Sequence, residues 1–113
     1  MPTTKPFKLS MTAAQLGLIT YDKPAAKVRA MGKELCSAIQ ESFEAAKIET
    51  LPDREVIKTV AEIYHNLDAR FGEHGFGDTE GRYGMCDATV QYLKAKGYDA
   101  LAEKLSGDFL LFA

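Results

Sequence analysis

Residues 28–46 read VRAMGKELCSAIQESFEAA, and their apolar side chains recur at every third or fourth position. Val28, Met31, Leu35, Ile39 and Phe43 therefore fall on one face of an α-helix, and charged or amide side chains occupy the other face. The stretch predicts a long amphipathic helix that begins near Pro24. A helix with a continuous apolar stripe needs other helices or a sheet to cover it, so this segment sets the fold class.

Four further segments carry helix signals. Residues 53–71 repeat the three- and four-residue apolar spacing, and Leu51-Pro52 separates them from the long helix. Residues 79–96 and 99–106 form two more predicted helices, with Gly97 turning the chain between them. Near the N-terminus, Thr12 and Gln15 match a capping box, which predicts a short helix over 13–21.

The rest of the chain completes a single domain. No segment shows sustained alternation of apolar and polar residues, and 113 residues is the usual length of one domain. Pro2 and Pro6 bias residues 1–10 toward an extended arm, and the C-terminal tail is apolar. We therefore expect residues 1–113 to form one all-α domain: a compact bundle of about five helices with an extended N-terminal arm and an apolar C-terminal tail.

The stretch RFGEHGFGDTEGRYGM, residues 70–85, holds five of the nine glycines. Its spacing matches neither a P-loop nor a dinucleotide-binding loop, and a helix rather than a strand precedes it. Residues 72–78 are best interpreted as a Gly-rich turn between helices, with Gly72 as a left-handed helix end. Gly81 and Gly84 fall inside the next helix, where glycine costs about 1 kcal/mol each relative to Ala, so we expect close packing or a partner-binding face there.

Composition excludes several classes of protein. No run of about 18 apolar residues would span a membrane, and the N-terminus lacks the features of a secretory signal, so we expect a cytoplasmic protein without membrane contact. Cys36 and Cys86 are isolated and show no zinc-binding spacing. Zinc binding would need His65, His74, Cys86 and an acidic residue to converge from two helices and a loop, but two cysteines and two histidines occur by chance in most chains. We expect neither a cofactor nor a metal.

The net charge of −2 conceals an asymmetry. Residues 1–33 carry six basic side chains and one acidic side chain, whereas the remainder is strongly acidic. The basic run Lys23, Lys27, Arg29 and Lys33 lies at the N-terminal end of the long helix, where the helix dipole disfavours cations by about 0.3–1 kcal/mol each. Three uses remain open: intramolecular pairing, an acidic protein partner, and nucleic acid, in that order.

Two catalytic interpretations are weaker. His65 is expected on the exposed side of its helix, near Arg54 and Lys58, as a phosphoacceptor would be, but the nearby Asp68 would repel a phosphoryl group. The loop containing His74 and Arg82 is the other candidate for a small enzyme, although no catalytic motif accompanies it. Buried cysteines generally behave as small apolar residues, which argues against a Cys86–His74 couple.

The leading prediction is a small binding protein that acts through protein–protein interaction, as an adaptor, inhibitor or accessory subunit. Compact helical proteins without motifs are frequent among phage and mobile-element inhibitors, which is an analogy only. The partner is expected to be another protein, with an acidic surface; a homodimer is an alternative, and DNA binding through the basic helix ranks lower. The predicted partner-binding residues are Lys23, Lys27, Arg29, Lys33, Arg82, Phe109 and Phe112.

Overall fold

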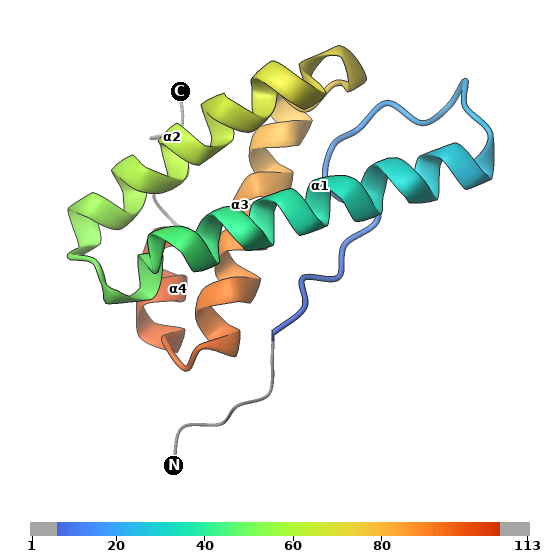
Figure 1. The fold of residues 1–113 in the computed structure, drawn as a ribbon. Helices are drawn as coiled ribbons and strands as arrows, with labels where there is room; N and C mark the ends of the chain where they lie inside the picture. Colours follow the sequence, from blue (N-terminus) through green and yellow to red (C-terminus); the bar gives the residue numbers. More distant parts are fainter. Residues whose placement is uncertain (1–6, 107–113) are drawn as a thin grey trace.

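The structure is a computed structural model that describes residues 7–106 of the chain. These residues form four α-helices and no strand, packed into one globule (Figure 1). The expected all-α class is confirmed. The helices are α1 (Ala25–Ala46), α2 (Asp53–Phe71), α3 (Thr79–Ala95) and α4 (Asp99–Ser106), with short 3₁₀ helices at Ile48–Thr50 and Gly72–His74.

The two longest helices follow the periodicity of their sequences. α1 buries Met31, Leu35, Ile39 and Phe43 along one stripe, as expected, together with Cys36. The buried stripe of α2 is Val56, Val60, Ile63, Tyr64, Leu67 and Phe71. In Figure 1 the two helices run in opposite directions, and the link between them is short, with Lys47 in the left-handed conformation at the end of α1.

The helix α3 crosses behind α1 and packs closely against α4 (Figure 1). Its interior glycines are explained by their neighbours. A Cβ at Gly81 would collide with the carbonyl oxygen of Phe76, and a Cβ at Gly84 would lie 2.7 Å from the main chain of Leu16. Both positions are buried, so close packing accounts for the two residues that helix propensity disfavours.

The prediction of a helix over residues 13–21 is wrong, because residues 13–17 form only a turn. The capping box does form: the N–H of Thr12 donates to the side-chain oxygen of Gln15 at 2.8 Å, and the N–H of Gln15 donates to the hydroxyl oxygen of Thr12 at 3.1 Å. Gly17, with φ of 81°, ends the segment after one turn. Its N–H bonds to Ala14 and the next N–H to Ala13, the pattern that terminates helices. Where about five helices were expected, residues 7–106 therefore form four.

Smaller expectations also need correction. Gly72 has right-handed backbone angles (φ −60°), and Gly75 is the left-handed residue of the Gly-rich turn, with φ of 98°. Asp78 directly precedes α3, and its side chain makes no capping hydrogen bond. Gly97 turns the chain with φ of 89°, as expected. Of the predicted arm, residues 1–6 lie outside the described residues, as does the apolar tail, 107–113.

Among residues 7–106, no helix combines the length and the apolar character that crossing a membrane requires.

Candidate functional site

A groove of about 590 Å³ lies between α1 and the segment before it. We call residues 7–13 the arm segment and this cavity the arm–α1 groove. One wall is formed by the arm segment and the other by two adjacent rows of side chains on α1. The lining residues are Lys8, Leu9, Ser10, Met11, Thr12, Ala13, Val28, Arg29, Gly32, Lys33, Cys36, Ser37 and Gln40.

Gln40 fixes one end of the arm segment to α1. Its side-chain oxygen accepts a hydrogen bond from the N–H of Leu9, and its Nε2 donates to the carbonyl of Phe7, both at 2.6 Å. One amide thus satisfies two main-chain groups of an extended segment that has no strand partner. Leu9 is buried, and the ring of Phe7 meets that of Tyr92 edge-on at 5.7 Å, so the arm is part of the core.

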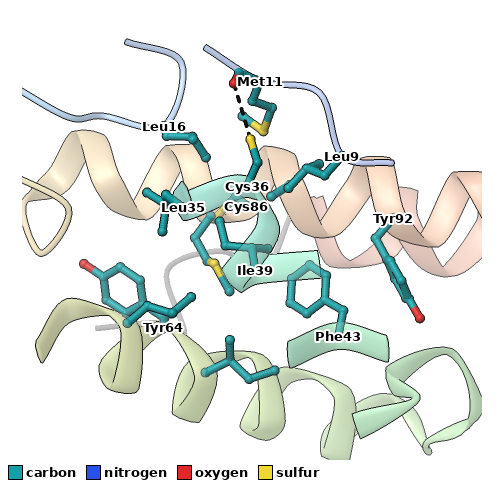
Figure 2. Close-up of a cluster of buried hydrophobic side chains, with 14 of the residues drawn as sticks. Leu9, Met11, Leu16, Leu35, Cys36, Ile39, Phe43, Tyr64, Cys86 and Tyr92 are labelled. Atoms are coloured by element: carbon teal, nitrogen blue, oxygen red, sulfur yellow. Dashed lines mark hydrogen bonds between the residues drawn. The ribbon is translucent and has the colours of Figure 1, made fainter. Parts of the chain in front are cut away.

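Two further contacts set the register of the arm on the helix. The thiol of Cys36 donates to the carbonyl of Met11 at 3.3 Å, shown as the dashed line in Figure 2. One turn earlier, Gly32 faces Ala13, where a Cβ would come within 3.0 Å of the Ala13 nitrogen. The arm therefore runs antiparallel to α1, and Gly32 permits the close approach.

The charged side chains of the groove all have the same sign. Lys8 comes from the arm, and Arg29 and Lys33 lie one turn apart on α1; all three are exposed. The lining includes no acidic residue, and none of the three cations forms an ion pair with another residue of 7–106. The first turn of α1 also lacks an acid to offset the helix dipole. The groove is a positive surface over an apolar floor.

The remaining predicted cations behave differently. Lys23 is held by its neighbour Asp22, with Nζ 3.2 Å from the carboxylate, and that hydrogen bond lowers the pKa of Asp22. Lys27 is exposed and makes no ion pair within the described chain, but it is not a lining residue of the groove. Of the basic run, Arg29 and Lys33 therefore line the groove together with Lys8.

Arg82 lies elsewhere, on α3, beside the Gly-rich turn. Burial raises the pKa of Tyr64, and a hydrogen bond with Arg82 opposes that rise. Asp68 and Asp78 are near enough to the same phenol to influence it. The hydroxyl of Tyr64 also donates to the carbonyl of Phe76 at 3.3 Å. Arg82 therefore has an intramolecular role in joining α2 to the start of α3, and its use by a partner stays a prediction.

The residues of the catalytic alternatives occupy different environments in the structure. His65 is exposed on α2, and the main-chain carbonyl of His74 accepts a hydrogen bond from Ile19 at 2.6 Å. Burial raises the pKa of Cys86 to about 12, which disfavours a reactive thiolate. No cluster of three or more His, Cys, Asp or Glu side chains suited to a metal occurs among residues 7–106. Phe109 and Phe112 fall outside the described residues.

Most of the groove was not predicted from the sequence. Lys8 contributed only to the basic charge of the N-terminal region, Gln40 was expected on a solvent-exposed face, and no role was predicted for Ser10, Ser37 or Gly32. A local signal was available, since a glycine inside a long amphipathic helix costs about 1 kcal/mol and indicates close approach of another main chain.

No protein-family model, no curated protein and no solved structure matches this chain. Inferences about the function of the groove therefore rest on its charge and packing.

Proposed function

We propose that this protein acts by binding another protein, whose acidic segment occupies the arm–α1 groove. The observation that carries the proposal is the convergence of Lys8, Arg29 and Lys33 on one groove without a counter-charge among residues 7–106. Like charges held close together repel one another, and an acidic ligand would relieve this repulsion. The roles of adaptor, inhibitor or accessory subunit in the cytoplasm all fit such a protein.

The composition of the groove favours a protein ligand over nucleic acid. Its floor contains apolar side chains of Leu9, Met11 and Cys36, and its rims are basic or hydroxyl-bearing. An apolar centre with a polar rim is the usual anatomy of a protein interface. Its lining has no aromatic side chain on which a base would stack, and the chain carries a net charge of −2.

Charge reversal on the α1 rim tests the proposal. We expect the wild-type protein, immobilised at low salt, to retain a near-stoichiometric partner from lysate of the source cell, both before and after nuclease treatment. The double variant Arg29→Glu/Lys33→Glu should lose that partner. The matched control is Arg54→Glu/Lys58→Glu, which reverses two exposed cations with the same four-residue spacing on α2 and should retain it.

Four results would contradict the proposal. The first is recovery of no stoichiometric partner by the wild-type protein. The second is equal retention by the groove variant and its control, which would place the interface elsewhere. The third is a partner that disappears on nuclease treatment, which would favour the DNA-binding alternative. Recovery of a second copy of the chain alone would replace the proposal with a homodimer.

A further inference from the structure

We infer that the segment bound in the arm–α1 groove is extended and carries acidic residues at every second position. This inference rests on the proposed function and specifies the chemistry of its ligand. It comes from the register with which the arm segment already lies on α1, and from the position of the cations in that register.

The arm shows how an extended chain fits this helix. Leu9 meets Gln40, Met11 meets Cys36, and Ala13 meets Gly32. Two residues of the arm therefore advance along the helix for every four residues of α1. The match is physical, because two extended residues rise about 6.6 Å and four helical residues rise about 6 Å.

The cations repeat the same spacing on the next row of the helix. Arg29, Lys33 and Ser37 are four residues apart, exposed, and line the groove beside the row that holds the arm. On the opposite wall, Lys8, Ser10 and Thr12 are alternate residues of the arm and are also exposed. Both rims of the groove thus present polar groups at intervals of about 6 Å.

An extended ligand matches both rims at once. Its alternate side chains point to opposite sides, so one row of carboxylates reaches Arg29 and Lys33 while the intervening row faces the arm and Lys8. A helical ligand would also space acids by about 6 Å along one face, so it is the pair of facing polar rims that favours an extended segment.

Three labelled nonapeptides of identical composition test the inference by fluorescence anisotropy with the full chain. Each contains three Asp residues among Ala and Ser, placed at positions 3, 5 and 7, at 4, 5 and 6, or at 1, 5 and 9. We expect the alternating peptide to bind at least tenfold more tightly than the other two. The preference should vanish in Arg29→Gln/Lys33→Gln and persist in the control Arg54→Gln/Lys58→Gln.

A gain of function provides a second readout. Ser37→Lys adds a third cation to the same row at an exposed position. It should tighten binding of the alternating peptide several-fold more than binding of the block peptide. Equal tightening of both would overturn the inference.

The outcomes separate the inference from the proposed function. If all three peptides bind equally and Arg29→Gln/Lys33→Gln weakens all of them, the spacing inference fails and the acidic-ligand groove stands. If that variant leaves every affinity unchanged, the groove is not the binding surface and the proposed function fails. Tightest binding of the helix-spaced peptide, or no binding of any peptide at millimolar concentration, would overturn the inference.

Discussion

The main chain of Leu16 rests directly on Gly84 of α3, so closely that a Cβ at position 84 would lie 2.7 Å from the Leu16 Cα. This contact joins the turn before α1 to the middle of α3. Gly17, in the same turn, likewise faces the main chain of Glu80 and Gly81. The N-terminal segment that forms one wall of the arm–α1 groove is therefore anchored to α3 as well as to α1.

Replacing Gly84 with alanine should destabilise the protein although alanine is the better helix former. Overpacking against a main chain costs about 1–3 kcal/mol or more, while the gain in helix propensity is about 1 kcal/mol. We expect Gly84→Ala to lower the free energy of unfolding by about 1 kcal/mol or more in urea titration. The control is Asp87→Ala, at an exposed position of α3, which should change the free energy of unfolding by only a few tenths of a kcal/mol. Stabilisation by Gly84→Ala would refute the contact.

Loss of the Gln40 amide should release the arm without unfolding the helices. Gln40→Met keeps most of the side-chain volume but removes both hydrogen bonds to Phe7 and Leu9. We expect the free energy of unfolding to fall by about 1–3 kcal/mol and hydrogen exchange at the Leu9 amide to become faster. Gln91→Met, at an exposed position of α3, should change neither quantity. Unchanged exchange at Leu9 would show that the amide does not hold the arm.

The hydrogen bond between Tyr92 and Glu49 should make the folded state less stable at alkaline pH. The hydroxyl of Tyr92 donates to the Glu49 carboxylate at 2.9 Å, and burial, followed by this carboxylate, raises the pKa of Tyr92. A phenol that keeps its proton longer in the folded state contributes its full stabilisation below about pH 10 and loses it as the pH rises further.

The variant Tyr92→Phe isolates that effect. At pH 7 it should cost about 1–2 kcal/mol, because Glu49 loses its donor. Above pH 10 the wild-type free energy of unfolding should fall by up to about 1.4 kcal/mol per pH unit more than that of the variant. Cys36, Cys86 and Tyr64, whose pKa values are also raised, contribute equally to both proteins. Parallel pH profiles would contradict the assignment.

The thiol of Cys86 should resist modification in the folded protein. Its pKa of about 12 leaves roughly one thiolate in 10⁴ at pH 8, and the side chain is buried. In a Cys36→Ser background, which keeps a donor to Met11, an aromatic disulfide reagent should react at least 10³-fold more slowly than in urea. Complete reaction within seconds under native conditions would show that α3 is more open than described.

The amphipathic helices could be predicted from the sequence because their information is local. α2 matches its predicted bounds, and α3 and α4 agree to within a residue or two, since apolar spacing and the proline and glycine signals act over a few residues. The segment 13–21 shows the limit. Its capping box forms, but Gly17 packs against α3 and stops the helix, and that partner is distant in the sequence.

The groove could be predicted only in part, for the same reason. Arg29 and Lys33 were recognisable as an unusual cluster on one helix. Their combination with Lys8 depends on the arm lying antiparallel to α1, which Gln40 and Cys36 impose through contacts more than twenty residues apart in the chain.

The central claim is that the arm–α1 groove is the surface that receives an acidic partner. Its most direct test is a titration of the ¹⁵N-labelled protein with the alternating acidic nonapeptide, followed by amide chemical shifts. We predict saturable shifts confined to the groove, at residues 8–13 and at Arg29, Lys33 and Ser37. Saturable shifts centred on α2 or α4, with the groove amides unchanged, would contradict the account.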